Sequence, residues 1–163
     1  MTRLIGYTVR SLVLDGVEEF VLSDTQGMPS TSGFVPDAAD LAGVQAWFER
    51  YDGLAAAQDY EGMADQAVFP LNEVTDDGKG QAKAEQFDRA GFVAQMAEVM
   101  GGGGDVTMET TRTPHFLSAG LVFVITDGTM TYGGHTQPIR YGDLLLKVDG
   151  EWHFQTMVQG GWG

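Results

Sequence analysis

The carboxyl-terminal part of the sequence constrains the fold most, because it predicts strands and tight turns with no helix between them. Alternating polar and apolar residues predict strands over residues 105–117, 119–132, 137–148 and 151–159. Short connections join them, at Ser118-Ala119-Gly120, Gly133-Gly134 and Asp149-Gly150. Strands joined by such short turns pair as antiparallel neighbours. This region therefore predicts a four-stranded antiparallel meander.

Helical patterns come before these strands. Apolar residues three and four positions apart predict helices over residues 38–58 and 88–100, the first with Asp37 as its N-cap. A short helix near residues 60–66 and a strand over residues 68–75 lie between them. We therefore expect an α+β fold, with helices packed on a strongly curved antiparallel sheet around a cone-shaped pocket. Bulges or bends that curve the sheet are expected at the glycines at positions 120, 128, 133, 134 and 142.

The amino-terminal residues form a separate pattern. Residues 4–23 predict a hairpin that turns at Asp15-Gly16, followed by a loop rich in Ser, Thr, Gly and Pro. We expect an amino-terminal hairpin and linker over residues 1–36 and a main domain over residues 37–163. One hypothesis is that the hairpin docks another protein.

Composition excludes several classes of partner. Nine Lys and Arg against 23 Asp and Glu give a net charge of -14, so neither nucleic acid nor an anionic membrane is an expected partner. No apolar run reaches the roughly 20 residues that cross a bilayer, and we expect a cytoplasmic protein. The chain has no cysteine, and its histidines at 115, 135 and 153 lack ligand spacing. No metal and no cofactor are therefore expected.

The final predicted hairpin carries polar groups on an apolar face. Tyr141 and Asp143 share that face with Ile139 and Leu145. Burial would raise the pKa of Asp143 and suit its carboxyl group to proton transfer, with a nearby His115 as a partner. The alternative is a structural ion pair between Asp143 and either Arg140 or Lys147.

His115 and Tyr51 each admit two interpretations. Strand alternation groups His115 with Glu109, Thr111 and Thr113 and points it outward, unless a bulge at Pro114 turns it inward. A structural histidine at a strand bend is the alternative to an acid or base. Tyr51 lies on the apolar stripe of the first long helix, which is typical of core residues as well as of a buried hydrogen-bond donor. His135 is expected in an exposed turn, and His153 facing away from the core.

Three segments, in this order and spacing, resemble the nuclear transport factor two-like superfamily. They are Arg50-Tyr51 with Gln58-Asp59-Tyr60-Glu61-Gly62, then Thr113-Pro114-His115-Phe116, and finally Arg140-Tyr141-Gly142-Asp143 with Asp149-Gly150-Glu151-Trp152. The superfamily includes ketosteroid isomerase, scytalone dehydratase, limonene epoxide hydrolase and the SnoaL polyketide cyclases. The resemblance runs from Asp37 to the carboxyl terminus and implies a cone-shaped, cystatin-like roll.

The resemblance also implies site residues. His115 is similar to the acid or base of scytalone dehydratase and is implied to lie inside, whereas Tyr51 is similar to the oxyanion-binding tyrosine of ketosteroid isomerase. The general base of that isomerase would fall on the strand Pro70-Leu71-Asn72-Glu73-Val74, so the base is Glu73, or it is absent or moved in this chain. The expected catalytic residues are His115, Asp143, Tyr51 and Tyr141. The expected substrate-binding residues are Phe48, Asp52, Phe69, Asn72, Glu73, Phe92, Met96, Trp152 and Phe154.

Two functions follow as hypotheses. The first is a cofactor-independent enzyme that acts on an apolar oxygenated ring by acid and base chemistry, as an isomerase, dehydratase, cyclase or epoxide hydrolase. The second is a non-catalytic module of the same fold that binds a ligand or dimerises. In either case, the expected partners are a small apolar or aromatic ligand and a second copy of the chain in a homodimer.

Overall fold

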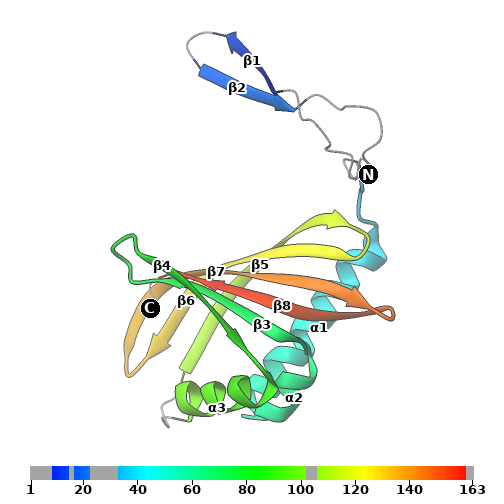
Figure 1. The fold of residues 1–163 in the computed structure, drawn as a ribbon. Coiled ribbons are helices and arrows are strands. Elements are labelled where there is room, and N and C mark those ends of the chain that lie inside the picture. Colours follow the sequence, from blue (N-terminus) through cyan, green and yellow to red (C-terminus); the bar gives the residue numbers. More distant parts are fainter. Residues whose placement is uncertain (1–8, 15–16, 23–32, 102–105, 161–163) are drawn as a thin grey trace, which may run out of the picture. The chain divides into compact units, whose positions relative to one another are not determined.

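The computed structural model describes residues 9–14, 17–22, 33–101 and 106–160, and the chain divides into two compact units, residues 1–33 and 34–163. The first unit contains strands β1 (Val9–Leu14) and β2 (Val17–Leu22), paired antiparallel (Figure 1). This pairing confirms the hairpin predicted there. The predicted turn at Asp15-Gly16 and most of the following loop lie outside the described residues.

Three helices of the second unit begin at aspartate caps. The helices are α1 (Ala38–Ala56), α2 (Tyr60–Asp65) and α3 (Arg89–Met100). Asp37 accepts hydrogen bonds from the backbone N–H groups of Ala39 and Asp40, at 2.8 and 2.9 Å. Such caps satisfy N–H groups that have no partner within the helix, so the three predicted helices are confirmed close to their predicted ends. No helix in the described parts of the chain is both long and apolar enough to cross a membrane.

The sheet of the second unit is mixed. Its strands are β3 (Ala67–Asp76), β4 (Ala82–Phe87), β5 (Val106–Ser118), β6 (Leu121–Tyr132), β7 (His135–Val148) and β8 (Glu151–Gln159). They lie in the order β4-β3-β8-β7-β6-β5, so the predicted meander from β5 to β8 is confirmed. β3 pairs parallel to β8, and β4, which we did not predict, pairs antiparallel to β3. The α+β class is confirmed, but the sheet is not wholly antiparallel.

The register shifts of the sheet lie at positions other than the predicted glycines. Register shifts occur after Phe116 in β5, beside Leu144 and Leu145 in β7, and between Ala67 and Asn72 in β3. Gly128 and Gly142 serve a different purpose, because a Cβ atom at Gly128 would overlap the Glu109 carbonyl oxygen and one at Gly142 would meet the Phe123 ring. These two glycines therefore permit close approach between neighbouring strands and side chains.

We expect Gly128→Ala to lower the free energy of unfolding by about 1 to 3 kcal/mol, because the added methyl group meets backbone that cannot move aside freely. Gly120→Ala is the matched control, since a Cβ there has no neighbour within 4 Å, and its effect should stay within about 0.5 kcal/mol. Urea unfolding measures both values. Equal urea midpoints for Gly128→Ala and Gly120→Ala would contradict the close approach of Gly128 to the Glu109 carbonyl group.

The helices lie on one face of the sheet (Figure 1), and the core cluster takes its residues from both. Aromatic rings fill much of it: Trp47 stacks on Tyr51 with ring centroids 5.1 Å apart, and Phe154 lies 5.8 Å from Trp47 and 5.7 Å from Phe92. Because these rings come from α1, α3 and β8, they hold the helices on the sheet. The polar groups described next lie beside this aromatic cluster.

Candidate functional site

A buried carboxyl group, that of Asp143, lies on the helix-facing side of β7. Its neighbours across the sheet are Val124 of β6 and Met157 of β8, and only 8% of its surface is exposed. Burial raises the pKa of Asp143 to about 7, an effect opposed by the nearby Arg112 and reinforced by Asp52. Asp143 can therefore exchange a proton near neutral pH.

The ion-pair alternative for Asp143 does not hold. Arg140 pairs with Asp127 at 3.1 Å, and Lys147 lies 3.9 Å from Asp40. Among the residues that the structure describes, no salt bridge involves Asp143. The carboxyl group is thus buried and forms no ion pair with any residue that the structure describes.

Two phenols lie next to this carboxyl group. Burial raises the pKa of Tyr51 far above its usual value, and the negative charge of Asp143 adds to the effect. Burial also raises the pKa of Tyr141, although a hydrogen bond from Arg112 opposes the change. Both phenols therefore stay neutral at physiological pH and can donate hydrogen bonds. Tyr51, Tyr141 and Asp143 thus lie close enough to influence one another electrostatically.

Arg112 of β5 links this cluster to α1. Its Nη1 and Nη2 atoms donate to the two carboxylate oxygens of Asp52 at 2.7 and 2.8 Å, and its guanidinium carbon lies 4.2 Å from the centre of the Phe48 ring. Strand register aligns Arg112 with Thr126 and Thr126 with Tyr141, which gives a polar row across β5, β6 and β7. The hydroxyl of Thr126 is buried and lies near Tyr141 without forming a regular hydrogen bond.

Arg112 and Thr126 were not among the residues predicted from the sequence. The signal was present for Arg112, because strand alternation places it on the face opposite His115, together with Thr110 and Pro114. Thr126 gives no such signal, since a threonine within a strand is common.

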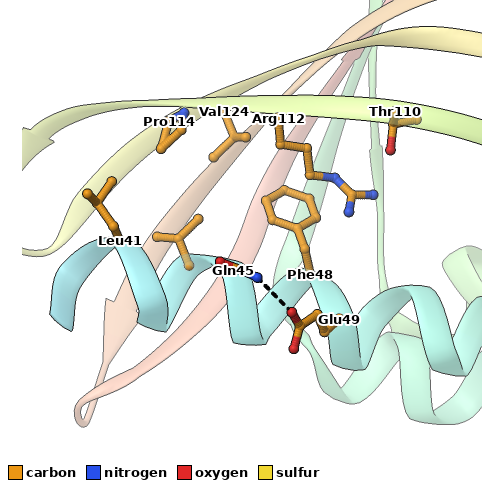
Figure 2. A pocket seen from close by; sticks show the side chains of 9 residues that line it. Leu41, Gln45, Phe48, Glu49, Thr110, Arg112, Pro114 and Val124 are labelled. Carbon is orange, nitrogen blue, oxygen red and sulfur yellow. Dashed lines mark hydrogen bonds between the residues drawn. The ribbon is translucent and has the colours of Figure 1, made fainter. Parts of the chain in front are cut away.

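A groove of about 450 Å³ lies between α1 and the edge strand β5. Its lining consists of Leu41, Val44, Gln45, Phe48 and Glu49 from α1, Thr110, Arg112 and Pro114 from β5, and Val124 from β6. Figure 2 shows the Arg112 side chain above the Phe48 ring, and the Gln45 amide donating to Glu49 at 2.9 Å. The groove is therefore largely apolar, with charged groups at Arg112 and Glu49.

The interior position implied for His115 is wrong. Its side chain is exposed and pairs across the sheet with Phe123, on the face away from the helices. Pro114 does not reverse the alternation, because β5 pairs with β6 without interruption from Val106 to Phe116. His115 is thus separate from Asp143, and the simple alternation of the strand gives its orientation correctly.

The other two histidines also lie apart from the cluster. His135 is exposed at the start of β7, as predicted. His153 is half-buried and alternates with the core residue Trp152, so it faces away from the core as predicted. Among the described residues, no three His, Asp or Glu side chains gather in a way that could hold a metal ion.

The predicted substrate-binding residues separate into three groups. Phe48 lines the groove, and Asp52 holds Arg112. Core positions are occupied by Phe92, Trp152 and Phe154, with Phe69 and Met96 packed against them. The remaining two make local contacts: Asn72 hydrogen-bonds Thr156 and Gln86, and Glu73 accepts a hydrogen bond from Gln95 at 2.7 Å. Most of the predicted substrate-binding residues therefore belong to the interior of the fold rather than to the lining of the groove.

No family model and no curated protein matches the sequence, whereas solved structures do match the fold. An NTF2-like protein of unknown function from Pseudomonas putida superposes with a TM-score of 0.63 at 15% identity, over 76% of this chain and 87% of that one. Aln2 from a Streptomyces species gives 0.63 at 16% identity, over 77% and 92% of the two chains. A provisionally named scytalone dehydratase from Novosphingobium aromaticivorans gives 0.55 at 15% identity, over 74% and 82%.

The chain therefore has the NTF2-like fold, which is the fold that the resemblance of the sequence segments implied. Identities this low establish the fold alone, because one fold supports many reactions. Function must be argued from the groove and the Asp143 cluster.

Proposed function

We propose that the chain is a small-molecule enzyme that moves protons on an apolar, oxygenated ring compound, with Asp143 as the acid or base. The observation that carries this proposal is the buried carboxyl group of Asp143, whose pKa lies at about 7 beside two neutral phenols. A general base works best when its pKa is near the pH of its surroundings. The arrangement separates a proton acceptor from hydrogen-bond donors, as proton abstraction beside a carbonyl group requires.

The groove supplies a place for the ligand. Its volume of about 450 Å³ lies within the range of about 300 to 1,000 Å³ that is common for small-molecule sites. Leu41, Val44 and Phe48 suit an apolar ring. Arg112 belongs both to the groove and to the polar row that ends at Tyr141, so it connects the two parts of the site.

Each polar group then has a role. Ionised Asp143 accepts a proton from the carbon next to a ligand carbonyl group and returns it elsewhere on the ring. Tyr51 and Tyr141 donate hydrogen bonds to the carbonyl oxygen as negative charge develops on it. Dehydration and isomerisation can both begin with this step, and one fold neighbour carries the name of a dehydratase.

Exchange of carbon-bound hydrogen with solvent tests this role without knowledge of the natural substrate. We expect the wild-type protein to accelerate deuterium uptake from heavy water into 2-tetralone, an apolar ring ketone, as followed by NMR. Asp143→Asn should lower that rate at least about 100-fold, because general-base catalysis contributes about 10² to 10⁴. His115→Ala is the matched control and should retain the wild-type rate, since His115 lies on the opposite face of the sheet.

Equal rates for the wild type and Asp143→Asn would remove Asp143 from the reaction. Loss of exchange in His115→Ala would contradict the assignment of the site to the helix-facing side.

A second candidate function is that of a non-catalytic ligand-binding module. It is favoured by one observation: the lining of the groove includes neither Asp143 nor the two tyrosines. Binding of 2-tetralone without any acceleration of exchange would select this function over the first. The homodimer and the cytoplasmic location expected from the sequence stay predictions.

A further inference from the structure

We propose that Asp52 determines the ligand class of the groove: by holding Arg112 in an ion pair, it makes the site select neutral oxygenated ligands over carboxylates. The inference rests on the proposed function only in using the same groove. It assigns Asp52 a role as a specificity-determining residue that does not itself need to touch the ligand.

The geometry of the pair leaves Arg112 without a free carboxylate-binding edge. A guanidinium group binds a carboxylate with two hydrogen bonds either through Nη1 and Nη2 or through Nε and one Nη atom. Asp52 occupies the first edge, at 2.7 and 2.8 Å. The second edge needs Nε, which is buried and therefore out of reach of a ligand in the groove. A ligand carboxylate therefore has no edge to occupy while Asp52 is in place.

The charges around the groove also disfavour the binding of a carboxylate ligand. Glu49 lines the groove one turn before Asp52 on α1, and both are carboxylates. With Arg112 as the nearby cation, the three groups sum to one negative charge, in a chain whose net charge is -14. An anionic ligand is repelled, whereas a neutral ketone or alcohol is not.

The same pair affects Asp143. The charged or titratable groups that influence this carboxyl group or its neighbouring phenol are Tyr51 and Asp52 from α1, Arg112 from β5 and Tyr141 from β7. Asp52 raises the pKa of Asp143 and Arg112 lowers it. Removing the Asp52 carboxylate takes away the first effect and frees Arg112 to strengthen the second, so the pKa of Asp143 should fall.

Calorimetric titration of two probes of matched shape tests the inference. The probes are 2-acetylnaphthalene, which is neutral, and 2-naphthoate, which is a carboxylate. Asp52→Asn should tighten binding of 2-naphthoate about tenfold, the gain from roughly one charge-assisted pair, and change binding of 2-acetylnaphthalene less than about twofold. The double variant Asp52→Asn/Arg112→Met should lose the gain.

Glu49→Gln is the matched control, because it removes the same charge from the same helix but leaves Arg112 paired. It should tighten 2-naphthoate less than about threefold, an effect that salt screens. An equal gain in Glu49→Gln and Asp52→Asn would overturn the inference in favour of a simple effect of net charge. Unchanged 2-naphthoate affinity in Asp52→Asn, or no binding of either probe to any variant, would overturn it as well.

Two further measurements support the test. Asp52 is half exposed, so we expect Asp52→Asn to fold. A second variant, Asp52→Ser, should also bind 2-naphthoate more tightly than the wild type does. NMR titration of the Asp143 carboxyl group should show a lower pKa in both variants, and an unchanged or higher value would overturn the inference. Because binding and titration are measured without turnover, absence of deuterium exchange would count against the enzyme and leave this inference standing.

Discussion

Asp143→Asn is expected to raise the free energy of unfolding by up to about 4 kcal/mol at about pH 8, and to change it little below about pH 4. The pKa of Asp143 is about 7 in the folded chain, against 3.8 for an ordinary aspartate. At a pH between these two pKa values, Asp143 is ionised in the unfolded chain and protonated in the folded chain. Stability that the protonated carboxyl group confers at low pH is therefore lost as pH rises from about 4 through about 7. Asparagine cannot ionise, so the variant keeps that stability.

Urea unfolding of both proteins across this range of pH measures the divergence. Asp127→Asn is the control, because Asp127 is an exposed carboxylate in a surface ion pair with Arg140. For Asp127→Asn, the curve of unfolding free energy against pH should remain parallel to that of the wild type. Parallel curves for Asp143→Asn would mean that Asp143 is ionised in the folded chain, and the acid and base role would lose its basis.

Phe154→Ala is expected to lower the free energy of unfolding by about 3 to 5 kcal/mol, the usual effect of removing a buried aromatic ring. Phe154 is 1% exposed, and its ring contacts those of Trp47, Tyr51 and Phe92. The ring thus joins α1 and α3 to β8, and its removal leaves a cavity among all three.

Thermal or urea unfolding measures this loss, with Tyr132→Ala as the control. Tyr132 is an aromatic residue at the end of β6 with 53% exposure, so its replacement should change stability by no more than about 0.5 kcal/mol. A small loss of stability in Phe154→Ala, together with weaker binding of 2-acetylnaphthalene, would indicate that Phe154 contacts the ligand, as the sequence analysis expected.

Local patterns accounted for most of the fold. The aspartates before each helix, the apolar spacing within α1 and α3, and the turns at Gly133-Gly134 and Asp149-Gly150 all act over a few residues, so they are visible in the sequence. The parallel pairing of β3 with β8 joins segments about 80 residues apart, and no local pattern encodes it. β4 is a largely exposed edge strand, whose sequence Ala-Lys-Ala-Glu-Gln-Phe lacks the usual apolar alternation.

In the candidate site too, local strand alternation could be predicted from the sequence, whereas contacts between distant segments could not. Tyr141 and Asp143 lie on one face of β7, because alternation along one strand fixes the orientation of both. The alternation of β5 alone places His115 outward, whereas the resemblance implied an interior position. Arg112 and Asp52 are 60 residues apart in sequence, so their pairing depends on how α1 lies against β5 and appears only in three dimensions.

Two ion pairs of α1, among the residues that the structure describes, restrain the width of the groove. Near its start, α1 is joined to β7 through Asp40 and Lys147, and near its end it is joined to β5 through Asp52 and Arg112. These contacts restrain the helix at two points more than three turns apart and on different strands, so tilting it away from the sheet would break at least one of them. The width of the groove is therefore set by a helix and a sheet that these ion pairs hold together, rather than by loops.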